Sequence, residues 1–205
     1  LSSVFEKTEL KFLQTVLSQG GKIGAIHVTG KDFTRSELDG WVTKAMQFGA
    51  KGLLWIRFNE QAQAESPVAK FLPADFLSHV QKIIPAAKAG DSLFVIAGQY
   101  QEAWTLLGRL RCAMAQELKL INEKEFKFCW VTDFPLFEYD KDSKSWNSVH
   151  HPFTSPQDGW EGKPLGEIKA RAYDVVLNGF ELGGGSIRIS KIDFQKKMLA
   201  FLGLD

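Results

Sequence analysis

The chain has 205 residues, enough for one large or two small domains, and 44% of them are hydrophobic, which is ample for a core. Its formal net charge of +1 gives no global attraction to nucleic acid or lipid, and no apolar run is long enough to span a membrane. The two cysteines, Cys112 and Cys129, fit neither a metal-ligand spacing nor a disulfide framework, so a reduced, cytoplasmic protein is expected.

Helix and strand patterns alternate through the first part of the chain. They predict, in order, helix 8–21, strand 22–28, helix 34–50, strand 52–58, helix 72–90, strand 91–99 and helix 102–120. Thr34 with Glu37 three residues later is a capping-box signature, and Pro85 interrupts the third helix. The last of these helices is expected to bury Trp104, Leu107, Leu110, Met114 and Leu118.

The second part of the chain is mostly strand and loop, so the expected fold class is α+β. The predicted segments are strands within 127–140 and 146–156, a surface loop over 155–171, a hairpin within 170–189 and a helix over 190–205. Asp133 precedes Phe134-Pro135, which indicates a buried strand that ends at Pro135. Asp193 is the expected cap of the final helix.

The hairpin has the strongest local signal, an Asn-Gly pair at 178 and 179 between two apolar runs. A two-residue turn here fixes the register of both strands. It pairs Leu177 with Phe180 and Val176 with Glu181, and it sets Asp174 opposite Gly183.

In this register Asp174 and Glu181 share a face as diagonal neighbours, with Cα atoms about 7–8 Å apart. Two carboxylates at that spacing repel unless a cation lies between them, and a hydrated Mg²⁺ that carries substrate phosphates suits the gap. Arg188 is an odd number of residues from Glu181, so a bulge within glycines 183–185 is needed to bring it to the same face. The alternative is a solvated hairpin with ordinary ion pairs, and spacing alone favours that alternative.

Adjacent histidines at 150 and 151 give a weaker signal. They point to opposite sides of an extended chain, so a shared zinc ion is not expected. One of them could donate a hydrogen bond to a substrate, although by chemistry alone packing at a loop edge is favoured. The sequence contains no phosphate-loop, dinucleotide or serine-hydrolase motif.

Three stretches taken together carry a resemblance. WVTDFPLFEYD at 130–140, HHPFTSP at 150–156 and ARAYDVVLNGFELGGGSIRI at 170–189 resemble, in that order, the bacterial-type aspartyl-tRNA synthetases, a class II family. Three stretches of the first part, GGKIGAIHV, SPVAKFL and DSLFVIAGQ, resemble the GAD domain inserted into these enzymes. The resemblance implies a GAD-like α/β insertion domain over 1–118 and part of the antiparallel β-sheet catalytic domain over 119–205.

The resemblance also implies roles for single residues. Asp174 and Glu181 would hold Mg²⁺ with the phosphates of ATP, and Arg188 would bind the side-chain carboxylate of aspartate. The remaining residues implied in the aspartate pocket are His150, His151 and Ser186. No residue is implied as a catalytic nucleophile, because the reaction depends on positioning and charge stabilisation.

The function implied for the full-length enzyme is activation of aspartate with ATP and its transfer to tRNA, by a cytoplasmic homodimer. The chain resembles a segment that starts at the insertion and stops before the third class motif, so it is expected to be inactive alone. It is also expected to expose an edge and apolar surface where neighbouring strands are missing. Two alternatives stay open: a non-catalytic module that docks tRNA or protein, and a non-discriminating synthetase that charges both tRNA(Asp) and tRNA(Asn).

Overall fold

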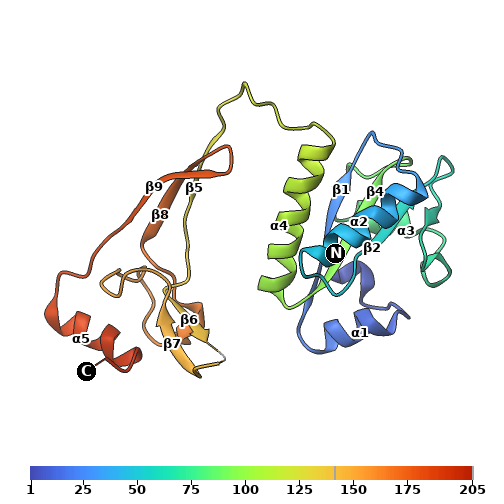
Figure 1. Cartoon of the computed structure of the whole chain (residues 1–205). Coiled ribbons are helices and arrows are strands. Elements are labelled where there is room, and N and C mark those ends of the chain that lie inside the picture. The colour runs from blue at the N-terminus through green and yellow to red at the C-terminus, as the bar shows by residue number, and fades with distance from the viewer. Residues whose placement is uncertain (141, 205) are drawn as a thin grey trace. The chain divides into compact units, whose positions relative to one another are not determined.

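The computed structural model describes residues 1–140 and 142–204, and the chain forms two compact units, Leu1–Ile121 and Asn122–Asp205 (Figure 1). Both contain helices and antiparallel sheet, so the predicted α+β class is confirmed. That the first unit is a GAD-like insertion and the second a partial catalytic domain stays a prediction. Within the described residues, no helix is long and apolar enough to cross a bilayer.

The first unit is built on a four-stranded sheet. Its strands follow the order β1, β4, β2, β3, and every neighbouring pair is antiparallel. Their bounds are β1 Lys22–Val28, β2 Leu54–Phe58, β3 Ala64–Glu65 and β4 Ser92–Gly98. The helices are η1 Ser2–Phe5, α1 Lys11–Ser18, α2 Arg35–Gln47, η2 Ala69–Phe71, α3 Phe76–Gln81 and α4 Tyr100–Glu117.

Helices cover both faces of this sheet, which explains why the inner strand β4 reads as an almost continuous apolar run. Phe94 and Ile96 point to the core shared with α2 and α4. Leu93 and Val95 point to the other core, which α1 and α3 close. Figure 1 shows α4 running alongside β1.

Two helix predictions for this unit need correction. The helix predicted over 72–90 is reduced to α3, which ends well before Pro85. Trp104, predicted inside, is 39% exposed. Its ring lies over Gly24 of β1 and packs at a tilt against Tyr100, with ring centroids 4.7 Å apart.

The capping box at the start of α2 is confirmed. The Thr34 side chain accepts from the Glu37 backbone N–H at 3.2 Å, and the Glu37 carboxylate accepts from the Thr34 N–H at 2.7 Å. Lys31 also donates to Glu37 at 2.8 Å. The Lys31 hydrogen bond first, and then those from Thr34, lower the pKa of Glu37 from 4.5 to about 2.

This lowered pKa predicts how stability changes with pH. Because the carboxylate is favoured in the folded state, its contribution is complete above pH 4.5 and is lost as the pH falls from there towards about 2. Glu37→Gln is therefore expected to flatten the pH dependence of thermal unfolding in that window. The control is Glu60→Gln at an exposed position, and an equal flattening by both variants would contradict the prediction.

The second unit contains two small antiparallel sheets. One is three-stranded, in the order β5, β8, β9, and the other pairs β6 with β7. The bounds are β5 Phe128–Val131, β6 Phe137–Asp140, β7 Ser145–Ser148, η3 Leu165–Glu167, β8 Ala172–Leu177, β9 Phe180–Ser186 and α5 Ile192–Phe201. Its core consists of Leu136, Phe137, Ile168, Ala170, Ala172 and Met198.

One face of the three-stranded sheet is aromatic and solvent-exposed, and we call it the aromatic face. Its aromatic side chains, which are between 40% and 75% exposed, are Phe128, Trp130, Tyr173 and Phe180. The predicted exposure of apolar surface is thus confirmed. The prediction of a buried strand up to Pro135 is wrong, because β5 ends at Val131 and all four of its residues are exposed.

The final helix also differs from prediction at its start. The N-cap is Lys191 and no side chain caps the helix, whereas Asp193 lies within the first turn. An acid there still interacts favourably with the helix dipole. The predicted end of this helix, Asp205, lies outside the described residues.

Candidate functional site

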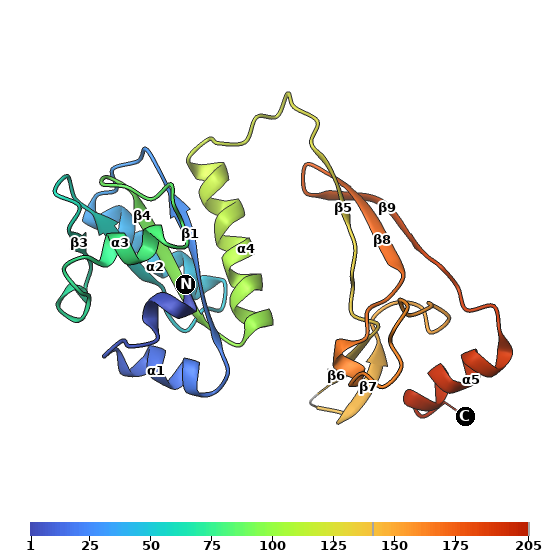
Figure 2. The ribbon, with the colours of Figure 1, turned by 180° about the vertical axis from the view of Figure 1, so that it is seen from behind.

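The hairpin between β8 and β9 is built as its turn predicts (Figure 2). Asn178 and Gly179 have φ values of 50° and 87°, the left-handed pair that a two-residue turn requires. Asn178 also accepts a hydrogen bond from the Lys127 N–H at 2.8 Å and donates to the Glu125 carbonyl at 2.7 Å. The turn residue therefore also holds the start of β5 against the hairpin.

The register of the hairpin is confirmed near the turn and differs beyond it. Leu177 pairs with Phe180 and Val176 with Glu181, but the pairing then shifts by one residue between Val175 and Val176. The next pair is Val175 with Gly183, so Leu182 is the extra residue of a β-bulge. Asp174 consequently lies opposite Gly184, and not Gly183 as predicted.

The space above Gly184 explains this register. A Cβ at Gly184 would collide with the Asp174 carboxylate and lie 3.0 Å from the Tyr173 carbonyl oxygen. Glycine thus lets the Asp174 side chain lie across β9. The bulge also reverses the alternation along β9, so Glu181 and Arg188 come to the same face. A bulge with this effect was predicted, but inside the glycine run and not before it.

The segment with the two histidines runs beside the end of β9. Thr154 forms an isolated antiparallel bridge with Arg188. On either side, Ser155 N–H donates to the Ile187 carbonyl and Ile189 N–H to the Phe153 carbonyl, both at 2.8 Å. This pairing brings His150 and His151 to the face that carries the acids.

A cavity of about 220 Å³ gathers these side chains. It is lined by His150, His151, Asp174, Glu181, Gly184, Gly185, Ser186 and Arg188. All six residues singled out from the sequence therefore line one cavity, on the face of the sheet opposite the aromatic face. Their assignment to particular ligands stays a prediction.

Hydrogen bonding fixes the proton position on one histidine. The Phe153 N–H donates to Nδ1 of His151 at 3.2 Å, so the neutral ring carries its proton on Nε2 and can donate it to a ligand. His150 packs edge-on against Phe134, with ring centroids 4.9 Å apart. Its Nε2 is shielded from solvent and has no hydrogen-bond partner among the described residues.

Sequence reasoning missed Thr154, which supports Ser186 in this cavity, and the Gln157–Asp133 hydrogen bond, which lies outside the cavity lining. Thr154 is buried and donates to Ser186 at 3.2 Å. Gln157 donates to Asp133 at 2.7 Å, and this bond, followed by one from Thr132, lowers the pKa of Asp133. No periodicity marks the Thr154–Ser186 and Gln157–Asp133 pairs, because the two residues of each pair are distant in sequence.

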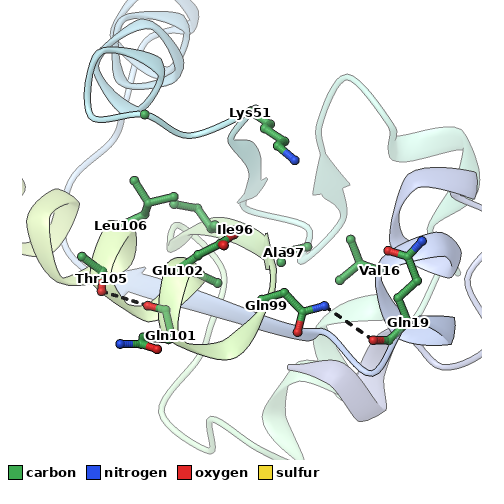
Figure 3. A pocket seen from close by; sticks show the side chains of 14 residues that line it. Val16, Gln19, Lys51, Ile96, Ala97, Gln99, Gln101, Glu102, Thr105 and Leu106 are labelled. Carbon is green, nitrogen blue, oxygen red and sulfur yellow. Dashed lines mark hydrogen bonds between the residues drawn. The ribbon is translucent and has the colours of Figure 1, made fainter. Parts of the chain in front are cut away.

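The first unit contains a larger cavity of about 570 Å³, between the 49–52 loop, β4 and the start of α4 (Figure 3). Its charged lining residues are Lys51 and Glu102 alone, and no histidine or cysteine lines it. The figure shows Gln99 donating to the Gln19 carbonyl across one end, at 3.5 Å. This cavity thus offers few chemical groups, and we take the smaller one, which gathers two acids, an arginine and two histidines, as the candidate site.

The smaller cavity fits a hydrated divalent cation that also has ligands from outside the protein. Asp174 and Glu181 supply hard oxygen ligands from adjacent strands, which is the chemistry that Mg²⁺ requires. Within residues 1–140 and 142–204, no cluster of three or more His, Cys, Asp or Glu could hold a metal unaided. The two carboxylates could therefore supply part of a ligand set, of the kind that substrate phosphates and water complete.

Known proteins of one family match this chain over almost its whole length. The family described as "tRNA synthetases class II (D, K and N)" matches residues 5–205. The chain is 42% identical over 208 residues to the aspartate–tRNA(Asp/Asn) ligase of Caldanaerobacter subterraneus, and 40% over 210 residues to the aspartate–tRNA ligase of Listeria monocytogenes. Each alignment covers 99% of this chain but only 35% of the relative.

Proposed function

Because the chain belongs to the class II tRNA synthetases of the D, K and N group, we propose that it is a segment of an aspartate–tRNA ligase. The full-length enzyme would activate aspartate with ATP and transfer it to tRNA. The proposal includes the homodimer and the cytoplasmic location expected for such an enzyme. It also retains the assignment of residues 1–118 to a GAD-like insertion and of 119–205 to part of the catalytic domain.

The observation that carries the proposal is the single cavity shared by Asp174, Glu181, Ser186, Arg188 and the two histidines. A non-catalytic docking module would have no need to bring two acids, an arginine and two histidines together in one concavity. The bulge at Leu182 is what makes this possible, and it leaves the aromatic face without any of these groups.

Each group has a proposed role in aspartate activation. Arg188 binds the side-chain carboxylate of aspartate, and Ser186 and His151 orient the amino acid with hydrogen bonds. The aspartate α-carboxylate attacks the α-phosphorus of ATP, the bond to the β-phosphate oxygen breaks, and pyrophosphate leaves. Asp174 and Glu181 would hold the cation that accompanies the phosphates. Bound Mg²⁺ would neutralise negative charge on these phosphates.

The test is aspartate-dependent ATP–pyrophosphate exchange, run on the full-length protein and on the 205-residue chain in parallel. We expect exchange by the full-length protein and none by the chain alone, because the cavity presents Arg188 as its only arginine for several negative groups. A full-length protein without exchange would overturn the proposed function. Exchange by the chain above a Glu181→Ala control would overturn the prediction that it is inactive alone.

A second candidate is supported by the names of the relatives. Proteins named aspartate–tRNA(Asp/Asn) ligase and proteins named aspartate–tRNA ligase occur at similar identity, 41% and 39% in two further cases. The alternative proposal is therefore an enzyme that charges both tRNA(Asp) and tRNA(Asn) with aspartate. Charging assays of the full-length protein with each tRNA separate the two proposals.

The fit between Gly184 and Asp174 gives a prediction for the full-length enzyme. Gly184→Ala is expected to lower the exchange rate at least tenfold, because the new Cβ displaces the Asp174 carboxylate from its place over β9. The matched control is Gly183→Ala, since a Cβ there meets nothing within 4 Å. Equal rates for the two variants would show that the position of Asp174 is unimportant.

A further inference from the structure

Thr154 is an unusual residue in the second unit. Three polar or charged side chains are buried among the described residues, Asp91, Ser92 and Thr154. Only Thr154 belongs to the second unit, where it is 1% exposed. A buried hydroxyl needs a hydrogen-bond partner, and its partner is Ser186, to which Thr154 Oγ1 donates at 3.2 Å.

This bond determines what the Ser186 hydroxyl can do. A serine hydroxyl has one proton to donate and can accept hydrogen bonds at its oxygen. Because Ser186 accepts from Thr154, its own proton is free for an acceptor in the cavity, which Ser186 lines together with Arg188. A carboxylate held by Arg188 is such an acceptor.

The backbone of Thr154 reaches two more residues of the same cavity. Its N–H donates to the His151 carbonyl at 2.9 Å, and it forms the antiparallel bridge with Arg188. Thr154 thus contacts Ser186 through its hydroxyl, and His151 and Arg188 through its backbone. A substitution can remove the hydroxyl bond while the two backbone contacts remain. Its contribution can therefore be measured separately.

We infer that Thr154 is a positioning residue for aspartate, which acts by orienting the Ser186 hydroxyl. The inference rests on the proposed function. It concerns the amino-acid end of the cavity only, because Asp174 and Glu181 lie nearer the turn of the hairpin. The expected signature is thus a change in aspartate recognition without a change in ATP recognition.

The experiment uses Thr154→Val in the full-length enzyme, with aspartate and ATP titrated separately in pyrophosphate exchange. Loss of one oriented hydrogen bond is expected to raise KM for aspartate about three- to tenfold, while KM for ATP and the thermal midpoint stay near wild type. Thr154→Ser keeps the hydroxyl and is expected to restore KM for aspartate. Ser155→Ala is the matched control, because that hydroxyl donates to the Pro156 carbonyl and not into the cavity.

A double-mutant cycle decides whether Thr154 acts through Ser186. Ser186→Ala alone and the Thr154→Val/Ser186→Ala pair are expected to have the same KM for aspartate. Additive effects, or an unchanged KM in Thr154→Val, would overturn the inference while the proposed function stands. An inactive wild-type enzyme would overturn both. If Thr154→Val and Thr154→Ala both fail to fold, the residue is purely structural and the inference is wrong.

Discussion

Arg188→Ala in the full-length enzyme is expected to lower kcat/KM for aspartate by roughly 10²- to 10³-fold in pyrophosphate exchange. Removing one partner of a close charge pair typically costs about 2–5 kcal/mol. Arg188 is exposed and is the only arginine in the cavity, so the loss should appear in ligand binding and leave folding intact.

The shape of the guanidinium group sharpens this prediction. Arg188→Lys keeps the positive charge but loses the two parallel donors that match a carboxylate, so an intermediate activity is expected. Discrimination between aspartate and asparagine should fall in both variants, since an amide cannot satisfy the arginine as a carboxylate does.

The control for Arg188 is Arg171→Ala. Arg171 is a neighbouring arginine, but both its side-chain hydrogen bonds, at 2.8 Å, go to Asp158, outside the cavity. Its removal is expected to change kcat/KM less than about threefold, as for other exposed ion pairs. Similar losses in the Arg171 and Arg188 variants would indicate a general effect of arginine removal and would refute the assigned role of Arg188.

Glu181→Gln is expected to lower the exchange rate by about 10²-fold and to raise the Mg²⁺ concentration needed for half-maximal rate. Glutamine has almost the same shape, so the change removes the charge and one hard oxygen ligand but leaves the β9 register in place. The measurement is a Mg²⁺ titration of exchange at saturating aspartate and ATP. Partial recovery at high Mg²⁺ is part of the expected result.

Two further variants test whether the effect of Glu181→Gln reflects the loss of cation binding. Asp174→Asn should reproduce the higher Mg²⁺ requirement, because Asp174 supplies the other carboxylate of the pair. Glu138→Gln, at an exposed position of β6 outside the cavity, should leave the titration unchanged. A Glu181→Gln enzyme with wild-type rate and Mg²⁺ dependence would show that the two acids do not hold a cation.

The sequence predicts the candidate site well where local chemistry determines structure. Asn178-Gly179 specifies its turn through backbone conformation, and the two pairs next to the turn follow directly. The bulge at Leu182 could not be located in this way, because several positions near the glycines can accept an extra residue. The structure places it where Asp174 meets Gly184, a contact between side chain and backbone that no pattern of hydrophobicity encodes.

The remaining errors have a similar origin. Trp104 has the helical spacing of a core residue, but it lies over Gly24, which has no side chain to pack against the ring, and it is 39% exposed. The apolar residues of β5 are typical of a buried strand, yet nothing within the described residues covers Phe128 or Trp130. Whether a residue is buried depends on which helices and strands pack against it. The sequence of one strand does not specify those neighbours.

The bulge at Leu182 has a consequence for how this stretch can change in evolution. Deleting one residue between Glu181 and Gly184 would remove the bulge and restore regular pairing, with Ser186 still opposite Ala172, so Glu181, Ser186 and Arg188 would stay on one face. Substitutions at Leu182, which is exposed, keep the alternation intact. A related chain with one residue fewer here could therefore keep the same site on a regular hairpin, whereas regular pairing at the present length would rotate Ser186 and Arg188 to the aromatic face.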